Sequence, residues 1–406
     1  MAKIRSTSGL KMSRILDTLS PSETLKISSQ AKDMIRKGIP VISLSAGEPD
    51  FDTPEPIKDA AKQALDNGFT KYTPSSGIGE LKQAIIDKFK RDNDLNYVPQ
   101  EIIVSCGAKH CIFNAIQVLT DPGNEVMVPH PYWVSYKEQI KFSISSMKVI
   151  PTRRENDFKL DARDLEKNMS RSVRALILNS PCNPTGAVYS KDELQQIADF
   201  AVRNEIWVIS DEIYEKMVYN GNKHISIAQL GGDIKDQTIV INGLSKAYAM
   251  TGWRIGYAAG SREVIGQMST LQAHTTSNPC SIAQKAAVVA LNQCAAHVGR
   301  MSNAFAKRRT IIMQGLDSIP GISYIEPQGA FYIFADMSGV YGKSHNGKII
   351  ANSRDLCLYL LDYAHVALIP GSAFGEDNFV RISYAASENN ITEAINRIDK
   401  ALKRLT

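Results

Sequence analysis

Short apolar segments rich in Val and Ile alternate with segments of helical periodicity between about residues 54 and 260. This alternation is typical of a mostly parallel sheet whose two faces are covered by helices. One intervening helix is marked by Thr53 and Pro54 at its start and by Gly68 at its end. The expected strands are 101–105, 125–129, 174–180, 206–212, 238–243 and 253–260. The pattern therefore predicts an α/β protein.

A second pattern begins after Met301. A long basic helical segment is followed by "GAFYIFADM", "VALIPG" and "FVRISYAA", which we interpret as strands, and by a last helix that Ser387 opens. These elements predict a smaller α+β unit. The early strand "VISLSAG" could join either unit by its pattern alone. The expected division is an N-terminal arm over 1–30, a large domain over 55–300, and a small domain made of 31–54 and 301–406.

Composition and charge exclude several classes of protein. The chain has 406 residues, which is too long for one ordinary domain, and its 43% hydrophobic and 22% charged residues exclude intrinsic disorder. A net charge of +5 is modest for this size, so no nucleic-acid partner is expected. The basic run Lys307, Arg308 and Arg309 lies beside apolar Ile311 and Ile312, which predicts a solvated helix face.

Targeting and cysteine patterns add two further expectations. No apolar run approaches the ~20 residues that cross a bilayer, and the N-terminus lacks the apolar centre of a secretory signal. We therefore expect a cytoplasmic protein with no membrane partner. The six cysteines show no CxxC spacing, so we expect reduced packing residues and no structural metal.

The segment "INGLSKAYAMTGWRIGYAAG" carries the main candidate for chemistry. It places Lys246 after an apolar strand, among small residues and eight residues before Arg254. An amine attacks a carbonyl group when desolvation or a nearby cation lowers its pKa, and both conditions are available here. A surface lysine at a strand end is the simpler alternative. We interpret Lys246 as a nucleophile.

A carboxylate follows another expected strand. Asp211 ends the apolar run 206–210, and the carboxyl ends of parallel strands face the crevice where α/β sheets bind ligands. Such a carboxylate can hold a pyridine nitrogen protonated and make that ring an electron sink. A helix cap or a metal ligand is the alternative, but no histidine cluster accompanies Asp211.

Two loops have weaker signals. "NSPCNPTG" packs two prolines and a glycine into a turn after a strand, and turns of this composition are usually structural. "SCGAKH" leads from a strand through Gly107 into a helix whose first amides could bind an anion such as phosphate.

Taken together, these segments resemble the fold-type I pyridoxal-phosphate aminotransferases of class I. The resemblance is closest to the class I-beta aspartate aminotransferases, a subgroup that includes prephenate-using members. It covers the chain from about Ser13 to the end. The matching segments occur in the family's order: "SLSAGEPDFDTP", "KYTPSSGIGELKQAI", "PHPYWVSY", "SPCNPTG", "SDEIYE", "GLSKAYAMTGWRIG", "EPQGAFYIF", "PGSAFG" and "FVRISYA".

The resemblance implies a large domain with a mostly parallel sheet, a smaller α+β domain, and pyridoxal phosphate as cofactor. It makes Lys246 the Schiff-base lysine and pairs Asp211 with the pyridine nitrogen. Asn183 and Tyr214 would hydrogen-bond the phenolic oxygen of the ring. Trp133 would stack over the ring face, where it also touches the substrate.

The resemblance also implies a phosphate site. Arg254 and the amides of Ala108 and Lys109 would bind the phosphate, with Ser245 nearby. Tyr72 would reach the phosphate of the neighbouring subunit. The resemblance therefore implies a homodimer.

Substrate contacts are implied in the same way. Arg381 matches the residue that binds the substrate α-carboxylate, and Gly47 and Asn183 add contacts there. Lys109 matches the cation for the second carboxylate. Thr24 matches a threonine that prephenate-using relatives employ near the distal end of the substrate.

The expected reaction is transfer of the amino group from L-aspartate to 2-oxoglutarate, which gives oxaloacetate and L-glutamate; use of prephenate stays open. The alternatives within the fold are aminotransferases for other amino acids and β-lyases. A non-catalytic binding module is a further alternative, although the reactive residues are all present. A nicotinamide site is excluded because no GxGxxG segment opens a helix.

Overall fold

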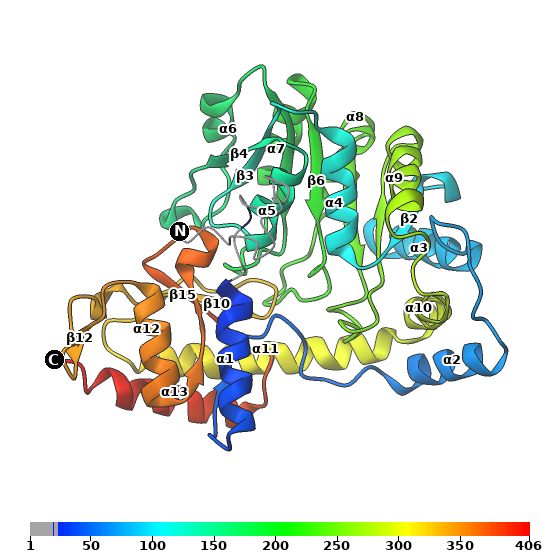
Figure 1. Ribbon diagram of the computed structural model, residues 1–406. Coiled ribbons are helices and arrows are strands. Elements are labelled where there is room, and N and C mark those ends of the chain that lie inside the picture. The colour runs from blue at the N-terminus through cyan, green and yellow to red at the C-terminus, as the bar shows by residue number, and fades with distance from the viewer. Residues whose placement is uncertain (1–18, 20–22) are drawn as a thin grey trace, which may run out of the picture.

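The computed structural model describes residue 19 and residues 23–406, with side chains from Lys26 onward. Figure 1 shows a larger unit built on a central sheet and a smaller unit beside it, with helix α1 (Glu23–Arg36) in front of the smaller one. Within this described part of the chain, every helix is too short or too polar to cross a membrane.

A seven-stranded sheet forms the centre of the larger unit, in the order β2-β8-β7-β6-β5-β3-β4. The strands are β2 (Ile102–Ser105), β3 (Glu125–Pro129), β4 (Ser146–Ile150), β5 (Val173–Asn179), β6 (Trp207–Asp211), β7 (Thr238–Gly243) and β8 (Gly256–Ala259). Only β8 runs antiparallel to its neighbours, and the other pairs are parallel. The predicted α/β class with a mostly parallel sheet is confirmed.

The six expected strands are all present, with ends shifted by up to three residues. Strand β4 was not predicted. It lies at the sheet edge and its residues are mostly half-buried or exposed, with Lys148 in its middle, so it lacks the apolar run of an inner strand.

Helices cover both faces of this sheet. The helices of the larger unit are α2 (Glu55–Asp66), α3 (Gly79–Asn93), α4 (Ala108–Leu119), α5 (Val134–Phe142), α6 (Ala162–Asn168), α7 (Lys191–Arg203), α8 (Gly232–Asp236), α9 (Arg262–Thr275) and α10 (Ser281–Gln293), of which α2 packs on α10 and not on the sheet. The alternation of side chains shows the two faces on β3. Val126 and Val128 pack with residues of α4, α5 and α9, whereas Met127 packs with residues of α6 and α7.

The smaller unit contains a four-stranded antiparallel sheet in the order β14-β15-β10-β9. Its strands are β9 (Ser323–Tyr324), β10 (Tyr332–Asp336), β14 (Ile369–Pro370) and β15 (Phe379–Ser383). Two short pairs lie outside this sheet: β1 (Ile42–Ser43) with β13 (Val366–Ala367), and β11 (Ser344–His345) with β12 (Lys348–Ile349). The pairing of β1 with β13 joins the early strand to the C-terminal part of the chain, which the pattern alone had left open.

Three further helices complete the smaller unit: α11 (Ala295–Asp317), α12 (Ser353–Tyr359) and α13 (Glu388–Leu402). As predicted, Ser387 opens the last helix, where its side chain accepts a hydrogen bond from Asn390 N. Helix α11 runs along the base of both units in Figure 1. Helix α1 continues across the expected boundary between residues 30 and 31, and α11 across the one between residues 300 and 301. The expected division into an arm and two domains therefore stays a prediction.

The basic run Lys307, Arg308 and Arg309 on α11 does not form the solvated helix face that its sequence predicted. Arg308 and Arg309 are buried, and only Lys307 is exposed. Arg308 Nη1 lies 2.6 Å from Asp50 Oδ1, and Arg309 pairs with Glu326. The prediction was wrong because acidic partners distant in sequence neutralise two guanidinium groups that α11 carries into the core.

The six cysteines, which all lie in the described part of the chain, form no disulfide bond with one another. Cys111, Cys294 and Cys357 are buried, in agreement with a packing role, whereas Cys280 is exposed.

Candidate functional site

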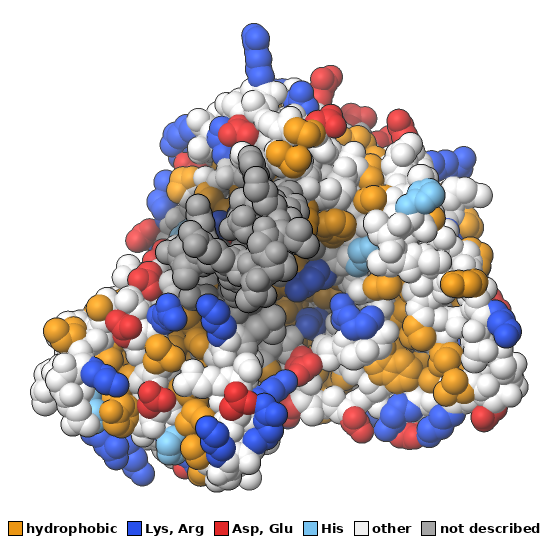
Figure 2. Space-filling model, viewed as in Figure 1, with side chains coloured by type: hydrophobic (Ala, Val, Ile, Leu, Met, Phe, Trp, Pro, Cys, Tyr) orange, Lys and Arg blue, Asp and Glu red, His pale blue; other side chains and the backbone are white. Residues whose placement is uncertain are grey.

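A cavity of about 750 Å³ lies where the carboxyl ends of the parallel strands meet the smaller unit. Figure 2 shows basic side chains near the centre of this face, between the positions of α1 and α4 in Figure 1. The residues expected at the site that line this cavity are Gly47, Ala108, Lys109, Trp133, Asn183, Asp211, Tyr214, Ser245, Lys246, Arg254 and Arg381. The fold thus gathers most of the expected site in one place.

Lys246 follows β7 and reaches into the cavity. Its Nζ donates a hydrogen bond to Gly47 O at 2.6 Å, a contact between residues 199 positions apart. The pKa of Lys246 is lowered to about 8, chiefly by burial; Glu48 opposes this shift, and Arg381 and Arg254 contribute to it. A substantial share of this amine is therefore neutral near physiological pH, as a nucleophile or base requires.

Asp211 is the last residue of β6, and its carboxylate is buried at the cavity. Tyr136 Oη donates to Asp211 Oδ2 at 2.7 Å, and Ile213 N donates to Oδ1 at 3.3 Å. Burial raises the pKa of Asp211 to about 6, and the hydrogen bond from Tyr136 opposes that rise. Asp211 can therefore bind or release a proton in the physiological range.

Arg381 lies in the middle of β15 and is only 3% exposed. Its Nη1 donates to Asn183 Oδ1 at 3.0 Å and its Nη2 to Ser45 O at 2.8 Å. The guanidinium carbon lies 4.3 Å from the ring centroid of Tyr332, and Nε has no acceptor among the described residues. Burial lowers the pKa of this arginine. A buried cation whose protein partners are all neutral is suited to an anionic ligand.

Helix α4 begins at the cavity with Ala108, and no side chain caps its first amides. Gly107 precedes it with φ +89°, and a Cβ there would lie 2.3 Å from Arg254 Nη2, so glycine lets the guanidinium lie against the turn. A Cβ on Gly256 of β8 would lie 2.1 Å from Ala108 N. Two glycines thus bring a helix N-terminus and an arginine together, which is a suitable arrangement for phosphate.

Lys109 and Trp133 form another side of the cavity. Lys109 Nζ lies 4.9 Å from the ring centroid of Trp133, and partial burial, with Arg254 close by, lowers the pKa of Lys109. Trp133 packs edge-on against Tyr136 with ring centroids 5.3 Å apart. Sequence reasoning missed Tyr136, although it stands one helical turn after Trp133 in the quoted segment "PHPYWVSY".

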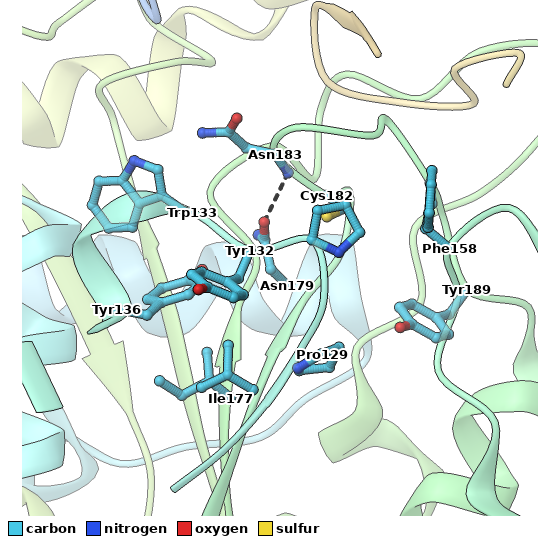
Figure 3. Close-up of a pocket in the computed structure, with 13 residues that line it drawn as sticks. Pro129, Tyr132, Trp133, Tyr136, Phe158, Ile177, Asn179, Cys182, Asn183 and Tyr189 are labelled. Atoms are coloured by element: carbon cyan, nitrogen blue, oxygen red, sulfur yellow. Dashed lines mark hydrogen bonds between the residues drawn. The ribbon is translucent and has the colours of Figure 1, made fainter. Parts of the chain in front are cut away.

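A second cavity of about 20 Å³ adjoins the first, and Figure 3 shows the residues around it. Trp133, Tyr136, Asn179 and Asn183 line both cavities. Asn183 N donates to Asn179 Oδ1 at 2.8 Å, the bond drawn in Figure 3, which fixes the loop after β5 to the end of that strand.

Tyr214 is buried at the cavity and follows β6. Its hydroxyl and that of Tyr332 lie 2.8 Å apart in a hydrogen bond. Tyr332 was another residue that sequence reasoning did not select, because a tyrosine within the strand pattern "GAFYIF" is typical of core.

The remaining expected residues are Tyr72 and Thr24. Tyr72 is 90% exposed and does not line the cavity of its own chain. Thr24 belongs to α1, but its side chain lies outside the described part of the structure.

A buried cluster of charged groups lies behind Asp211. Ligand atoms of Glu212, Glu215 and His224 lie within 4.8 Å of one another, a spacing that could hold a metal ion. Lys88 Nζ, however, lies 2.6 Å from Glu215 Oε1, and Ser226 donates to Glu212. The ammonium group of Lys88 already neutralises Glu215, which favours a structural ion-pair cluster over a metal site.

Comparisons with known proteins agree with this geometry. The sequence profile described as "Aminotransferase class I and II" matches residues 39–398. An aspartate aminotransferase of Bacillus sp. (strain YM-2) is 50% identical over 386 residues, which cover 95% of this chain and 97% of that protein. A probable aspartate/prephenate aminotransferase of Aquifex aeolicus is 44% identical over 389 residues, covering 95% and 97%. The crystal structure of the aspartate aminotransferase from Rhizobium meliloti is similar with a TM-score of 0.94, at 45% identity, over 98% of this chain and all of that one.

Proposed function

Because this chain belongs to the class I and II aminotransferases, we propose that it is a pyridoxal-phosphate-dependent aspartate aminotransferase. It transfers the amino group of L-aspartate to 2-oxoglutarate and releases oxaloacetate and L-glutamate. The observation that carries the proposal is the cavity in which a lysine with a lowered pKa, a buried carboxylate and a buried arginine face one another.

The residues around the cavity fit pyridoxal phosphate. The uncapped amides of α4 and Arg254 provide a site for its phosphate, in a turn that only glycine allows at position 107. Asp211 provides an anion for the ring nitrogen, and Trp133 a flat apolar surface for the ring. Asn183 Oδ1 already accepts from Arg381, so the Nδ2 group is left to donate to a ligand oxygen.

Pyridoxal phosphate, when bound, supplies an aldehyde that bonds to amines and a cationic ring that accepts electrons from the substrate carbon. Lys246 is the amine that holds it in the resting protein. When Nζ of Lys246 is not bonded to the cofactor, it would act as the base that takes up the proton from the substrate Cα. The lowered pKa of Lys246 increases the neutral fraction that this transfer needs.

Arg381 selects and orients the amino acid. Its buried guanidinium binds the α-carboxylate through charge-assisted hydrogen bonds, while Asn183 and Ser45 hold it from behind. With the carboxylate fixed, the Cα–H bond is directed towards Lys246. Lys109 binds the second carboxylate and favours dicarboxylic substrates.

Tyr72 acts in the site of a second copy of the chain. Tyr72 is 90% exposed and does not line the cavity of its own chain, and both observations support this assignment. We propose that the working enzyme is a homodimer on this basis.

The test is reduction of the protein with borohydride after loading with pyridoxal phosphate, followed by peptide mass spectrometry. We expect the cofactor mass on Lys246. Lys109 is the matched internal control, since it is a second amine lining the same cavity and should stay unlabelled. Label on Lys109 alone, or none at all, would overturn the proposal.

Substrate range is tested by adding single amino acids to the loaded protein and following the loss of its visible absorbance band. Aspartate and glutamate should react fastest. Prephenate is included as an amino acceptor because the similar Aquifex protein is named for it.

A further inference from the structure

We propose that Tyr136 is a positioning residue for Asp211, whose hydroxyl keeps the carboxylate ionised and in one orientation at the cavity. The proposal rests on the proposed function, in which Asp211 meets the ring nitrogen of the cofactor. None of the residues expected from the sequence had this task.

Burial and a backbone hydrogen bond hold Tyr136 in place. Tyr136 is 2% exposed, and its N donates to Trp133 O at the start of α5, which anchors it next to the end of the sheet. Its Oη lies 2.7 Å from Asp211 Oδ2, shorter than the 3.3 Å bond from Ile213 N to Oδ1. The tyrosine is therefore the stronger of the two donors. Each carboxylate oxygen keeps a lone pair for a further donor in the cavity.

The charge of Asp211 depends on the hydrogen bond from Tyr136, because burial and Glu212 favour its neutral form. The titratable groups that interact with it are Cys111, Tyr136, Cys182, Glu212, Tyr214 and Lys246. Burial and Glu212 raise the pKa of Asp211, whereas Tyr136, Ile213 N and Lys246 lower it. Because the resulting value is about 6, loss of one donor moves the titration into the neutral range.

The ring of Tyr136 has a second, separable effect. It contacts Trp133 edge-on, with an interplanar angle of 85°, and Figure 3 shows both rings on the same side of the small cavity. Tyr136→Phe removes the hydroxyl and keeps this ring contact. Tyr136→Leu removes both, so comparison of the two variants separates the effect on Asp211 from the effect on Trp133.

The experiment measures the Kd of pyridoxal phosphate for the full chain, stripped of cofactor, at pH 6 and pH 9. Loss of a hydrogen bond to a charged group raises the pKa of Asp211 by about one unit in Tyr136→Phe. At pH 6 the ionised fraction then falls from about one half to about one tenth, so Kd should rise about fivefold. At pH 9 Asp211 is ionised in both proteins and Kd should be unchanged.

Two controls isolate the contact. Tyr189→Phe removes another buried hydroxyl at the small cavity, one bonded to Leu160 N, and should leave both Kd values unchanged. An analogue of pyridoxal phosphate with carbon in place of the ring nitrogen should bind wild type and Tyr136→Phe equally at pH 6. In an Asp211→Asn background, Tyr136→Phe should have no further effect.

The results that would overturn the role of Tyr136 differ from those that would overturn the proposed function. An equal loss of affinity at pH 6 and pH 9, an equal loss for the carbon analogue, or no loss at either pH would overturn the role of Tyr136. Each of these can occur while Lys246 is still labelled by borohydride, so the aminotransferase proposal would stand. Failure of wild type to bind or be labelled would instead overturn the proposed function.

Discussion

At the scale of single residues, the site contains ionisable groups whose hydrogen-bond partners among the described residues are neutral. Arg381 contacts an amide, a backbone carbonyl and aromatic rings, and Lys246 contacts a backbone carbonyl. Burying a charge without a counterion costs free energy. The presence of such charges in this cavity therefore indicates that a bound ligand supplies the missing partner. Three predictions follow from individual side chains.

The first concerns Arg381→Leu. Loss of two charge-assisted hydrogen bonds to a carboxylate should raise the KM for aspartate about 100-fold. Stability should change little, because leucine removes an uncompensated charge from the core. The control is Arg309→Leu, another buried arginine, bonded to Pro327 O, which should lower Tm and leave KM unchanged. A normal KM in Arg381→Leu would contradict the assignment.

The second concerns Lys109→Ala. Removal of this cation should lower kcat/KM about 30-fold for aspartate, because one charge-assisted contact to the distal carboxylate is lost. Aromatic amino acids, which lack that carboxylate, should react almost as before. Lys32→Ala is the matched control, since Lys32 lines the same cavity from α1. An equal loss for all substrates would defeat the idea.

The third concerns stability and pH. The pKa of Lys246 is about 8 in the folded protein and near 10.5 when unfolded. Between these values the unfolded chain binds more protons, so the wild type gains stability as pH rises. Relative to Lys246→Met, the free energy of unfolding of the cofactor-free protein should increase by about 2–3 kcal/mol from pH 7 to pH 10. Urea unfolding at both pH values measures this, and the exposed Lys167→Met should show no such trend.

At the scale of elements, the ends of neighbouring strands and helices hold the site in place. From the last residue of β6 onward, Asp211 and Tyr214 lie at the cavity, and Glu212 and Glu215 belong to the ion-pair cluster behind it. The same short segment therefore contributes residues both to the cavity and to the ion-pair cluster behind it. Strand β8 contacts the first turn of α4 so closely that only glycine fits at position 256.

Gly256→Ala tests this contact between β8 and α4. Its Cβ would lie 2.1 Å from Ala108 N and 2.3 Å from Gly107 C, so the first turn of α4 must move. The displaced amides should bind phosphate less well, and we expect Kd for pyridoxal phosphate to rise at least about tenfold, with a lower Tm.

Gly266→Ala is the matched control for that substitution. Gly266 lies within α9 with open space around it, so alanine should stabilise the protein by about 0.5–1 kcal/mol without changing Kd. Unchanged cofactor binding in Gly256→Ala would show that the contact does not support the phosphate site.

At the scale of the whole molecule, the cavity depends on both units. Arg381 and Gly47 come from elements of the smaller unit, whereas Lys246 and Asp211 follow strands of the large sheet. Tyr72 is exposed and does not line this cavity. Under the proposed function, the site therefore also depends on Tyr72 from a second copy of the chain.

Mixing two inactive or impaired variants tests the role of Tyr72. Lys246→Ala has no catalytic amine, and Tyr72→Phe should bind cofactor more weakly. In a mixed dimer, one site combines Lys246 from one chain with Tyr72 from the other and should recover wild-type affinity. Activity that rises above that of Tyr72→Phe alone after subunit exchange is the expected result. The absence of any recovery would place Tyr72 in the site of its own chain or outside both sites.

Local patterns in the chain were sufficient for the fold class and for the reactive centre. Buried parallel strands have continuous apolar runs, and residues at their carboxyl ends face the ligand crevice, so Asp211 and Lys246 could each be selected as a candidate at a strand end before any coordinates. The resemblance to a family added Arg381, Arg254 and Trp133, which the structure brings to the same cavity. Their individual roles stay predictions until the variants are measured.

Tertiary structure alone decided which partners those residues have. Lys246 and Gly47 are 199 residues apart, and Arg381 and Asn183 are 198 apart, so no local pattern relates them. The same holds for Tyr136, whose hydroxyl meets an acid 75 positions away. Periodicity records which side of a helix or strand is apolar, but burial of a charge depends on groups brought together from distant segments, and these partners determine its pKa.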